Sequence, residues 1–150
     1  VVPGVFARRK NQIGLIRAMR GSSISIVFMG DAMEKEYYDE CVNAASGNMY
    51  FIGHKDNGSK AYWSVLRHAK CACLPSDCET PGIAMIEAAF AGARPIVTRF
   101  GGTVEYYGFD AEYLTPYRKT SIVDSINRGW QRGRLTEDQS ALYSRRPDEN

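Results

Sequence analysis

The segment 71–92, CACLPSDCETPGIAMIEAAFAG, holds two sets of side chains that could do chemistry. Three cysteines, at positions 71, 73 and 78, could bind a metal or act as nucleophiles. Two glutamates, Glu79 and Glu87, could accept hydrogen bonds from the hydroxyl groups of a ligand. Pro81 and Gly82 lie between the glutamates, at the start of an apolar run. We expect the carboxylates, rather than the thiols, to carry the function.

The four cysteines of the chain, at positions 41, 71, 73 and 78, do not have the spacing of a zinc site. Such a site needs paired C-x2-C motifs or a nearby pair of histidines. Cys71 and Cys73 alternate with Ala72 and Leu74 in an apolar run of strand length, so we expect both thiols to pack as small hydrophobic groups. The low cysteine content also argues against a disulfide framework. We therefore expect no bound metal and a reduced, cytoplasmic setting.

Glu87 stands alone in a segment of helical length and apolar composition, residues 82–91. A helix that is apolar on all sides is expected to be buried, and a buried carboxylate needs hydrogen-bond donors or a cation. Two interpretations are open on the residues alone. Either Glu87 lines a polar cavity with Glu79 at its mouth, or Glu87 pairs with a core Arg or Lys while Glu79 stabilises the N-terminus of the helix.

The start of this helix is suited to an anion. Its first backbone N–H groups have no partner within the helix, and the helix dipole adds positive charge there. Gly82 would let a ligand approach the backbone closely. The whole arrangement suits a nucleotide sugar, whose ribose diol would donate to Glu87 and whose diphosphate would accept from the amides of Gly82 and Ile83. A hydroxyl of the sugar would meet Glu79.

Apolar runs of strand length alternate along the chain with segments of helical periodicity. We expect strands at residues 1–6, 23–30, 48–53, 70–75, 94–98 and 112–115. We expect helices at residues 10–21, 34–46, 61–69, 81–92 and 121–130, with Ser59 as the cap of the third. This alternation predicts an α/β fold: a Rossmann-like, doubly wound parallel sheet of about six strands with helices on both faces. Ligands of such sheets bind beyond the carboxyl ends of the strands.

The composition is typical of a globular protein, with 44% hydrophobic and 24% charged residues. The 150 residues are expected to form one domain. A net charge of +2 with dispersed Lys and Arg does not favour nucleic acid as a partner. No apolar run approaches the roughly 20 residues that a membrane-spanning helix needs. The strand-like start and the polar end are those expected of a piece of a longer protein.

The segment ETPGIAMIE, followed by AAFAGARPIVTRFGG, resembles the E-x7-E signature of retaining GT-B glycosyltransferases. The segments GVFARRKN, IVFMGD, MYFIGH and KCACLPSDCE resemble further motifs of this family, in the same order. The likeness runs from about residue 4 to residue 131. It implies one half of a GT-B fold, and the transfer of a sugar, of hexosyl type, from a nucleoside diphosphate to an acceptor with retention of anomeric configuration.

The resemblance also implies roles for the matching positions. Glu87 would bind the hydroxyls of the ribose, and Glu79 would hold the donor sugar near its reacting carbon, as the catalytic residue. The backbone of Gly82 and Ile83 would bind the diphosphate, and Lys10 would supply an opposing positive charge. Fixed amides together with a cation would stabilise the charge that develops on the leaving diphosphate.

Two positions depart from the pattern of the family. Val5 stands where the family has an arginine, and Arg8 or Arg9 in the same loop is the candidate to replace that cation. Pro81 stands where the family usually has an aromatic residue. A proline has no N–H to donate, but it suits the beginning of a helix next to a bound donor.

Other side chains near these motifs have more ordinary interpretations. The resemblance places Gly53 and His54 beside the base of the nucleotide, mostly through main-chain contacts. On the residues alone, Tyr62 and Trp63 are more typical of core packing than of base stacking, and His68 is more typical of a surface or packing residue.

The resemblance covers only the donor-binding half of a GT-B enzyme. Residues 1–150 would then be a single nucleotide-sugar-binding domain that lacks the N-terminal acceptor domain and the final crossover helix, and would be inactive alone. The donor is a substrate and no cofactor is expected. A sugar, glycan or lipid-linked acceptor would bind through the missing domain. The arginines of segment 128–134, with Arg145 and Arg146, would form a solvated face, open to peripheral contact with an anionic membrane where the acceptor is a lipid.

Other classes with a doubly wound sheet fit the sequence less well. A response-regulator receiver needs clustered acidic residues after its first strand and an Asp after its third, where this chain has Gly4-Val5 and Gly53-His54. A dinucleotide-binding dehydrogenase needs G-x-G-x-x-G after its first strand, where this chain has GVFARRK. A GT-B epimerase, or an inactive relative that only binds the nucleotide sugar, remains an alternative.

Overall fold

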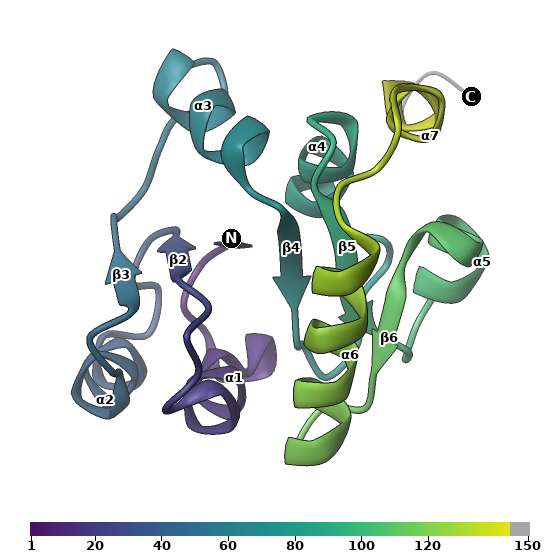
Figure 1. Cartoon of the computed structure of the whole chain (residues 1–150). Helices are drawn as coiled ribbons and strands as arrows, with labels where there is room; N and C mark the ends of the chain where they lie inside the picture. Colours follow the sequence, from purple (N-terminus) through teal and green to yellow (C-terminus); the bar gives the residue numbers. More distant parts are fainter. Residues whose placement is uncertain (145–150) are drawn as a thin grey trace.

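The computed structural model describes residues 1–144 and shows an α/β fold with parallel strands (Figure 1). The strands are β1 (Val2–Pro3), β2 (Ile26–Met29), β3 (Met49–Phe51), β4 (Cys71–Leu74), β5 (Arg94–Thr98) and β6 (Glu112–Leu114). The α-helices are α1 (Gln12–Met19), α2 (Lys35–Ala44), α3 (Lys60–His68), α4 (Ile83–Phe90), α5 (Thr103–Tyr107), α6 (Lys119–Arg132) and α7 (Glu137–Ala141). Short 3-10 helices cover Arg8–Lys10, Gly108–Asp110 and Leu142–Ser144.

The strands form two three-stranded parallel sheets, in the orders β1-β2-β3 and β4-β5-β6. The N-terminus lies between β2 and β4 (Figure 1), where it connects the two sheets. The amino group of Val1 donates to the carbonyl of Cys71 at 2.8 Å, and the N–H of Cys73 donates to the carbonyl of Val1 at 2.8 Å. The strand order is therefore 3-2-1-4-5-6, the Rossmann order. The predicted doubly wound fold is confirmed, with a seam between β1 and β4.

Helices cover both faces of the strands, as predicted. Successive side chains of a strand point to opposite faces, so neighbouring residues join different cores. Phe28 and Cys73 belong to a core formed with α1, α2 and α6. Met29 and Leu74 belong to a second core, which includes residues of α3, α4 and α5. Among residues 1–144, no helix is long and apolar enough to cross a membrane.

The predicted elements are mostly longer than the observed ones. The strand predicted at residues 1–6 is regular only at Val2–Pro3, because Gly4 turns the chain away with φ +131°. Helices α5 and α7 were not predicted, since five residues are too few to show a helical period. Ser59 caps α3 as expected, and its Oγ accepts a hydrogen bond from the N–H of Tyr62 at 3.1 Å.

Helix α4 differs from its prediction in position and in burial. It begins at Ile83 rather than at Pro81, and Gly82 is its N-cap. The expectation that this apolar helix is buried on all sides is wrong: Ile83 is 70% exposed and Phe90 is 45% exposed. The middle of the helix, including Met85, is buried. The N-terminal turn of α4 is therefore accessible to a ligand.

Candidate functional site

A cleft of about 430 Å³ lies at the carboxyl ends of β1, β2 and β3, where a doubly wound fold binds its ligands. This volume is within the range of roughly 300–1,000 Å³ that small-molecule sites occupy. The loops that follow these three strands line it, together with the first turns of α3 and α4. Of the predicted site residues, His54, Ile83 and Glu87 line this cleft.

Glu87 is half-buried and lines this cleft. Its Oε2 accepts a hydrogen bond from the hydroxyl of Tyr62, and within residues 1–144 no Lys or Arg forms an ion pair with it. Burial, and secondarily this hydrogen bond, raise the pKa of Tyr62, so the phenol remains a donor at neutral pH. Of the two interpretations of Glu87, the structure supports the one in which it faces a cavity.

Backbone groups form much of the wall opposite α4. Gly30 donates its N–H to the carbonyl of Gly53 at 3.1 Å, and it passes so close to the carbonyl of Gly4 that a side chain at position 30 would overlap it. His54 Nδ1 lies 3.4 Å from Asp31 Oδ2, and both side chains are exposed in the cleft. Gly53 lies directly before this lining segment. The wall is thus made of main chain with a few polar side chains at its rim.

The N-terminus of α4 presents free amides to the cleft. Ile83 and Ala84 both line the cleft, and within the described residues no acceptor is bonded to either N–H. Gly82 has φ +85°, and a Cβ built there would lie 3.2 Å from Leu74 Cδ1. Glycine is needed at position 82 for the turn that aims these amides.

Glu79 lies beside the start of α4, in a second group of predicted site residues. Its buried carboxylate forms an ion pair with Lys10 Nζ and accepts a hydrogen bond from Ser76 Oγ at 2.7 Å. Its backbone is also fixed, because its N–H donates to the carbonyl of Phe100 and its carbonyl accepts from Gly102. The two glutamates therefore have different surroundings: Glu87 faces the cleft with a phenol, and Glu79 is neutralised by a cation.

The two candidates for the missing arginine point to different places. Arg8 donates to Glu40 at 3.2 Å and its guanidinium lies 5.3 Å from the centre of the Tyr37 ring, so it is directed at α2. Arg9 is exposed, and within residues 1–144 its guanidinium has no ion-pair partner. Its carbonyl accepts the N–H of Asp77 at 2.9 Å, which holds this loop against the loop after β4. Arg8 is thus engaged elsewhere, and the placement of Arg9 at a phosphate stays a prediction.

The two groups of site residues meet at the start of α4. The Cβ position of Gly82 is 3.6 Å from Glu79 Oε2, and the next residue, Ile83, lines the cleft. Pro81 precedes them, and its carbonyl accepts a hydrogen bond from the hydroxyl of Tyr107 at 2.8 Å. The loops after β1, β2, β3 and β4 and the start of α4 are thus brought to one edge of the strands.

The sequence did not reveal two side chains that support these groups: Tyr62, and Ser76 as partner of Glu79. Tyr62 was expected in the core, and it is buried as expected, but its hydroxyl reaches the cleft. No sequence signal marks such a residue, because its partner lies 25 positions away on another helix.

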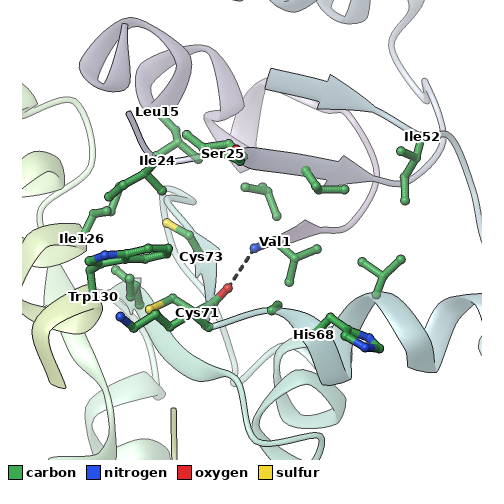
Figure 2. Close-up of a pocket in the computed structure, with 17 residues that line it drawn as sticks. Val1, Leu15, Ile24, Ser25, Ile52, His68, Cys71, Cys73, Ile126 and Trp130 are labelled. Atoms are coloured by element: carbon green, nitrogen blue, oxygen red, sulfur yellow. Dashed lines mark hydrogen bonds between the residues drawn. The ribbon is translucent and has the colours of Figure 1, made fainter. Parts of the chain in front are cut away.

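A second cavity, of about 510 Å³, lies at the other end of the strands (Figure 2). Figure 2 shows the amino group of Val1 inside it, bonded to the carbonyl of Cys71. Its walls are mainly apolar and include Trp130 of α6. It lies at the amino ends of β2 and β4 and contains none of the predicted site residues, so we do not assign the function to it.

The cysteines pack as predicted. Cys73 is buried and Cys71 is half-buried, both on the face that meets α1 and α6. Burial raises the pKa of Cys73 to about 12, which leaves its thiol uncharged and unreactive at neutral pH. Within residues 1–144, no three His, Cys, Asp or Glu side chains lie close enough together to hold a metal ion.

The arginines of segment 128–134 are exposed, as expected, and they also form contacts within the fold. Arg128 and Arg132 pair with Glu112, at 2.7 and 2.9 Å. Arg134 donates to the carbonyl of Ala91 at 2.6 Å. Their exposed side chains thus also tie α6 and the chain after it to neighbouring elements. Arg145 and Arg146 lie outside the described residues.

The fold and the cleft define a doubly wound α/β protein with a ligand site at the carboxyl ends of its strands. The chain belongs to the glycosyl transferases group 1 family, whose sequence profile matches residues 1–139. This membership agrees with the resemblance noted in the sequence. No curated protein sequence is similar enough to the chain to add a relative.

Several solved structures share the fold. The chain is similar to HepE from Anabaena, described in complex with UDP and glucose (TM-score 0.74, 19% identity over 95% of this chain). It is also similar to sucrose-phosphate synthase from Thermosynechococcus elongatus (TM-score 0.68, 21% identity over 87%) and to the catalytic domain of cholesterol-alpha-glucosyltransferase from Helicobacter pylori (TM-score 0.67, 17% identity over 95%). The chain spans 41% of the HepE chain, 36% of the synthase chain and 94% of the Helicobacter domain.

Proposed function

We propose that the chain is the donor-binding half of a retaining glycosyltransferase, in which Glu79 and Glu87 are the two acids of the E-x7-E motif. The observation that supports this most is the position of Glu87. It presents a carboxylate to a cleft at the carboxyl ends of the strands, and its partner there is the phenol of Tyr62 rather than a cation. Such a carboxylate is free to accept hydrogen bonds from two neighbouring hydroxyls, as the 2′ and 3′ hydroxyls of a ribose would require.

The diphosphate of the donor would bind at the start of α4. The free N–H groups of Ile83 and Ala84, the flexible backbone of Gly82 and the positive end of the helix dipole all favour an anion there. The description of the similar HepE structure as a complex with UDP and glucose is consistent with a nucleotide diphosphate at this edge.

Lys10 and Glu79 would act at the other end of the diphosphate. An ammonium group has three N–H donors, so Lys10 can keep its bond to Glu79 and still donate to a phosphate oxygen. Arg9, exposed in the same loop, would add charge in place of the arginine that Val5 replaces. Glu79, held by Lys10 and Ser76, would then accept a hydrogen bond from a hydroxyl of the sugar.

In the reaction, the bond between the anomeric carbon and the diphosphate oxygen breaks, and the diphosphate leaves with the electron pair. The acceptor oxygen forms the new bond on the same face of the sugar, and its proton passes to the leaving diphosphate oxygen. Negative charge therefore develops on the diphosphate, and the amides of α4 with Lys10 are the preorganised groups that stabilise it. Neither step requires a metal or a cofactor.

The base would lie along the main chain at Gly53 and His54, where backbone groups and the exposed His54–Asp31 pair form the rim of the cleft. The acceptor would bind a further domain of the whole enzyme, since the chain covers less than half of the HepE chain. We propose a hexosyl donor and a cytoplasmic enzyme, with membrane contact only where the acceptor is a lipid.

The proposal is tested by calorimetric titration of the purified protein with UDP-, GDP- and ADP-sugars. One base should bind with a dissociation constant between about 1 µM and 1 mM. The Glu87→Gln variant should bind that donor at least about tenfold more weakly, since it loses charge-assisted hydrogen bonds to the ribose. Glu36→Gln, an exposed glutamate on α2, is the matched control and should bind as the wild type does. A folded protein that binds none of the three donors would show the proposal to be wrong.

Retention has its own test in the whole enzyme. The anomeric configuration of the first product, determined by NMR before it can equilibrate, should equal that of the donor. An inverted product would exclude the retaining mechanism while leaving the donor site intact.

A further inference from the structure

We propose that Tyr62 is a positioning residue for donor binding: its hydroxyl holds the Glu87 carboxylate in the orientation that receives the ribose diol. This inference rests on the proposed function, because it assigns to Glu87 the role described above. Tyr62 lies outside the E-x7-E motif, on α3 rather than α4. It would act on the ligand only through the Glu87 carboxylate.

The geometry of the contact leaves the carboxylate available to a ligand. The Tyr62 hydroxyl, from the first turn of α3, donates to Oε2 of Glu87, in the second turn of α4. Within residues 1–144, Oε1 has no hydrogen-bond partner, and both residues line the cleft. One oxygen is therefore anchored while the other, and a lone pair of the first, can accept from the ligand.

The position of Tyr62 is itself determined by its contacts with Ser59 and Trp63. Its N–H donates to the capping Ser59 Oγ at 3.1 Å, which sets the backbone of the first turn of α3. Its ring meets the Trp63 ring edge-on, with centroids 5.6 Å apart. Trp63 in turn donates to the carbonyl of Asn57 at 2.8 Å and meets the ring of Phe90 on α4 at 6.1 Å. The phenol is therefore a rigid anchor between the two helices.

A rigid anchor has a clear thermodynamic effect on a flexible glutamate. A free Glu side chain loses rotamer freedom when a ligand fixes it, and this loss weakens binding. Because Tyr62 fixes the side chain before the ligand arrives, the ligand does not bear that entropic loss. The effect should appear only with ligands that contact the carboxylate, that is, with ligands that carry the ribose hydroxyls.

The test compares two variants with two ligands. Tyr62→Phe removes the hydroxyl and keeps the ring. Tyr143→Phe is the matched control, because Tyr143 is also buried and its hydroxyl also donates to a carboxylate, Asp110 Oδ2 at 3.0 Å, away from the cleft. The ligands are the nucleoside diphosphate of the base that binds best and its 2′,3′-dideoxy analogue, titrated into each purified protein by calorimetry.

Tyr62→Phe should bind the nucleoside diphosphate about three- to tenfold more weakly, the size of one hydrogen bond, and should bind the dideoxy analogue as the wild type does. Tyr143→Phe should leave both affinities unchanged. In a Glu87→Gln background, adding Tyr62→Phe should have no further effect, because the two residues act through one contact.

The outcomes separate the inference from the proposed function. If Tyr62→Phe lowers the affinity for both ligands equally, Tyr62 is only a packing residue and the inference is wrong. If the wild type binds and Glu87→Gln abolishes binding while Tyr62→Phe binds normally, the inference is wrong and the donor site stands. If the wild type binds no nucleotide, both are wrong.

Discussion

Lys10 and Glu79, 69 positions apart in the sequence, form a buried ion pair at the start of α4, with side chains only 12% and 7% exposed. The pair joins the 3-10 helix after β1 to the loop after β4, and so it crosses the seam between the two sheets. Ser76 Oγ donates a hydrogen bond to the same carboxylate oxygen, Oε1 of Glu79, that Lys10 contacts. A charge that is buried in this way is tolerated because its partner is in place.

Removing the cation should therefore destabilise the protein. Lys10→Met leaves the Glu79 carboxylate buried and unpaired, and should lower the free energy of unfolding by about 3 kcal/mol in urea denaturation. The double variant Lys10→Met/Glu79→Gln should recover part of this loss. Lys35→Met, which removes an exposed pair with Asp39, is the control and should change stability by less than about 0.5 kcal/mol. If the two lysine variants lowered the free energy of unfolding equally, burial of the Lys10–Glu79 pair would not be the cause of the effect.

Gly82→Ala should reduce both stability and donor affinity. A side chain at φ +85° is strained, and its Cβ would lie 3.2 Å from Leu74 Cδ1, so we expect a loss of about 1–2 kcal/mol in thermal unfolding. The strain should also displace the amides of Ile83 and Ala84. Gly47→Ala has open space around its Cβ and should be neutral or slightly stabilising. A Gly82→Ala protein that is as stable as Gly47→Ala would refute the need for glycine.

The thiols should differ in reactivity according to burial. Burial raises the pKa of Cys73 to about 12 and that of Cys41 to about 11, so at pH 8 only about one Cys73 thiol in ten thousand is ionised. Iodoacetamide should therefore modify the exposed Cys78 first, as mass spectrometry of the labelled peptides would show. Rapid labelling of Cys73 in the folded protein would contradict this.

Serine substitutions should separate the thiols from the function. Cys71→Ser and Cys73→Ser place a hydroxyl among apolar groups, so they should lower stability. Nucleotide binding should be unchanged, because both residues line the apolar cavity and neither lines the cleft. Titration of each variant with the donor checks this, and a lost affinity would reopen a role for the cysteines.

Glu112 should make stability depend on pH. Burial by itself would raise the pKa of its carboxyl, but the hydrogen bonds from Arg128 and Arg132 outweigh burial and lower the pKa below the ordinary 4.5. A lowered carboxyl pKa stabilises the fold fully above the unfolded-state pKa, and this contribution is lost as the pH falls through the folded-state value. The stability difference between wild type and Glu112→Gln should thus be largest above about pH 5 and decline below pH 4.5. A difference that is constant from pH 7 to pH 3 would show that the ion pairs contribute nothing.

The sequence alone was sufficient for the features that depend on neighbouring residues. The alternation of strands and helices, the cap at Ser59 and the glycine before α4 follow from local periodicity and backbone preference. The resemblance of several segments to GT-B glycosyltransferases, among them the one that holds Glu79 and Glu87, pointed to the family that the profile match over residues 1–139 shows. The inert packing of Cys71 and Cys73 followed from their alternation in a strand.

Only the tertiary structure decided which partners the functional residues have. The pairing of Lys10 with Glu79 and of Tyr62 with Glu87 joins segments 69 and 25 positions apart, and no local pattern encodes such contacts. The hydrogen bond of Arg8 to Glu40 depends on the packing of α2. The seam at β1, the exposed first turn of α4 and the cleft between them arise when separate elements meet. These features depend on how side chains from distant segments pack against one another, and local sequence patterns do not specify that packing.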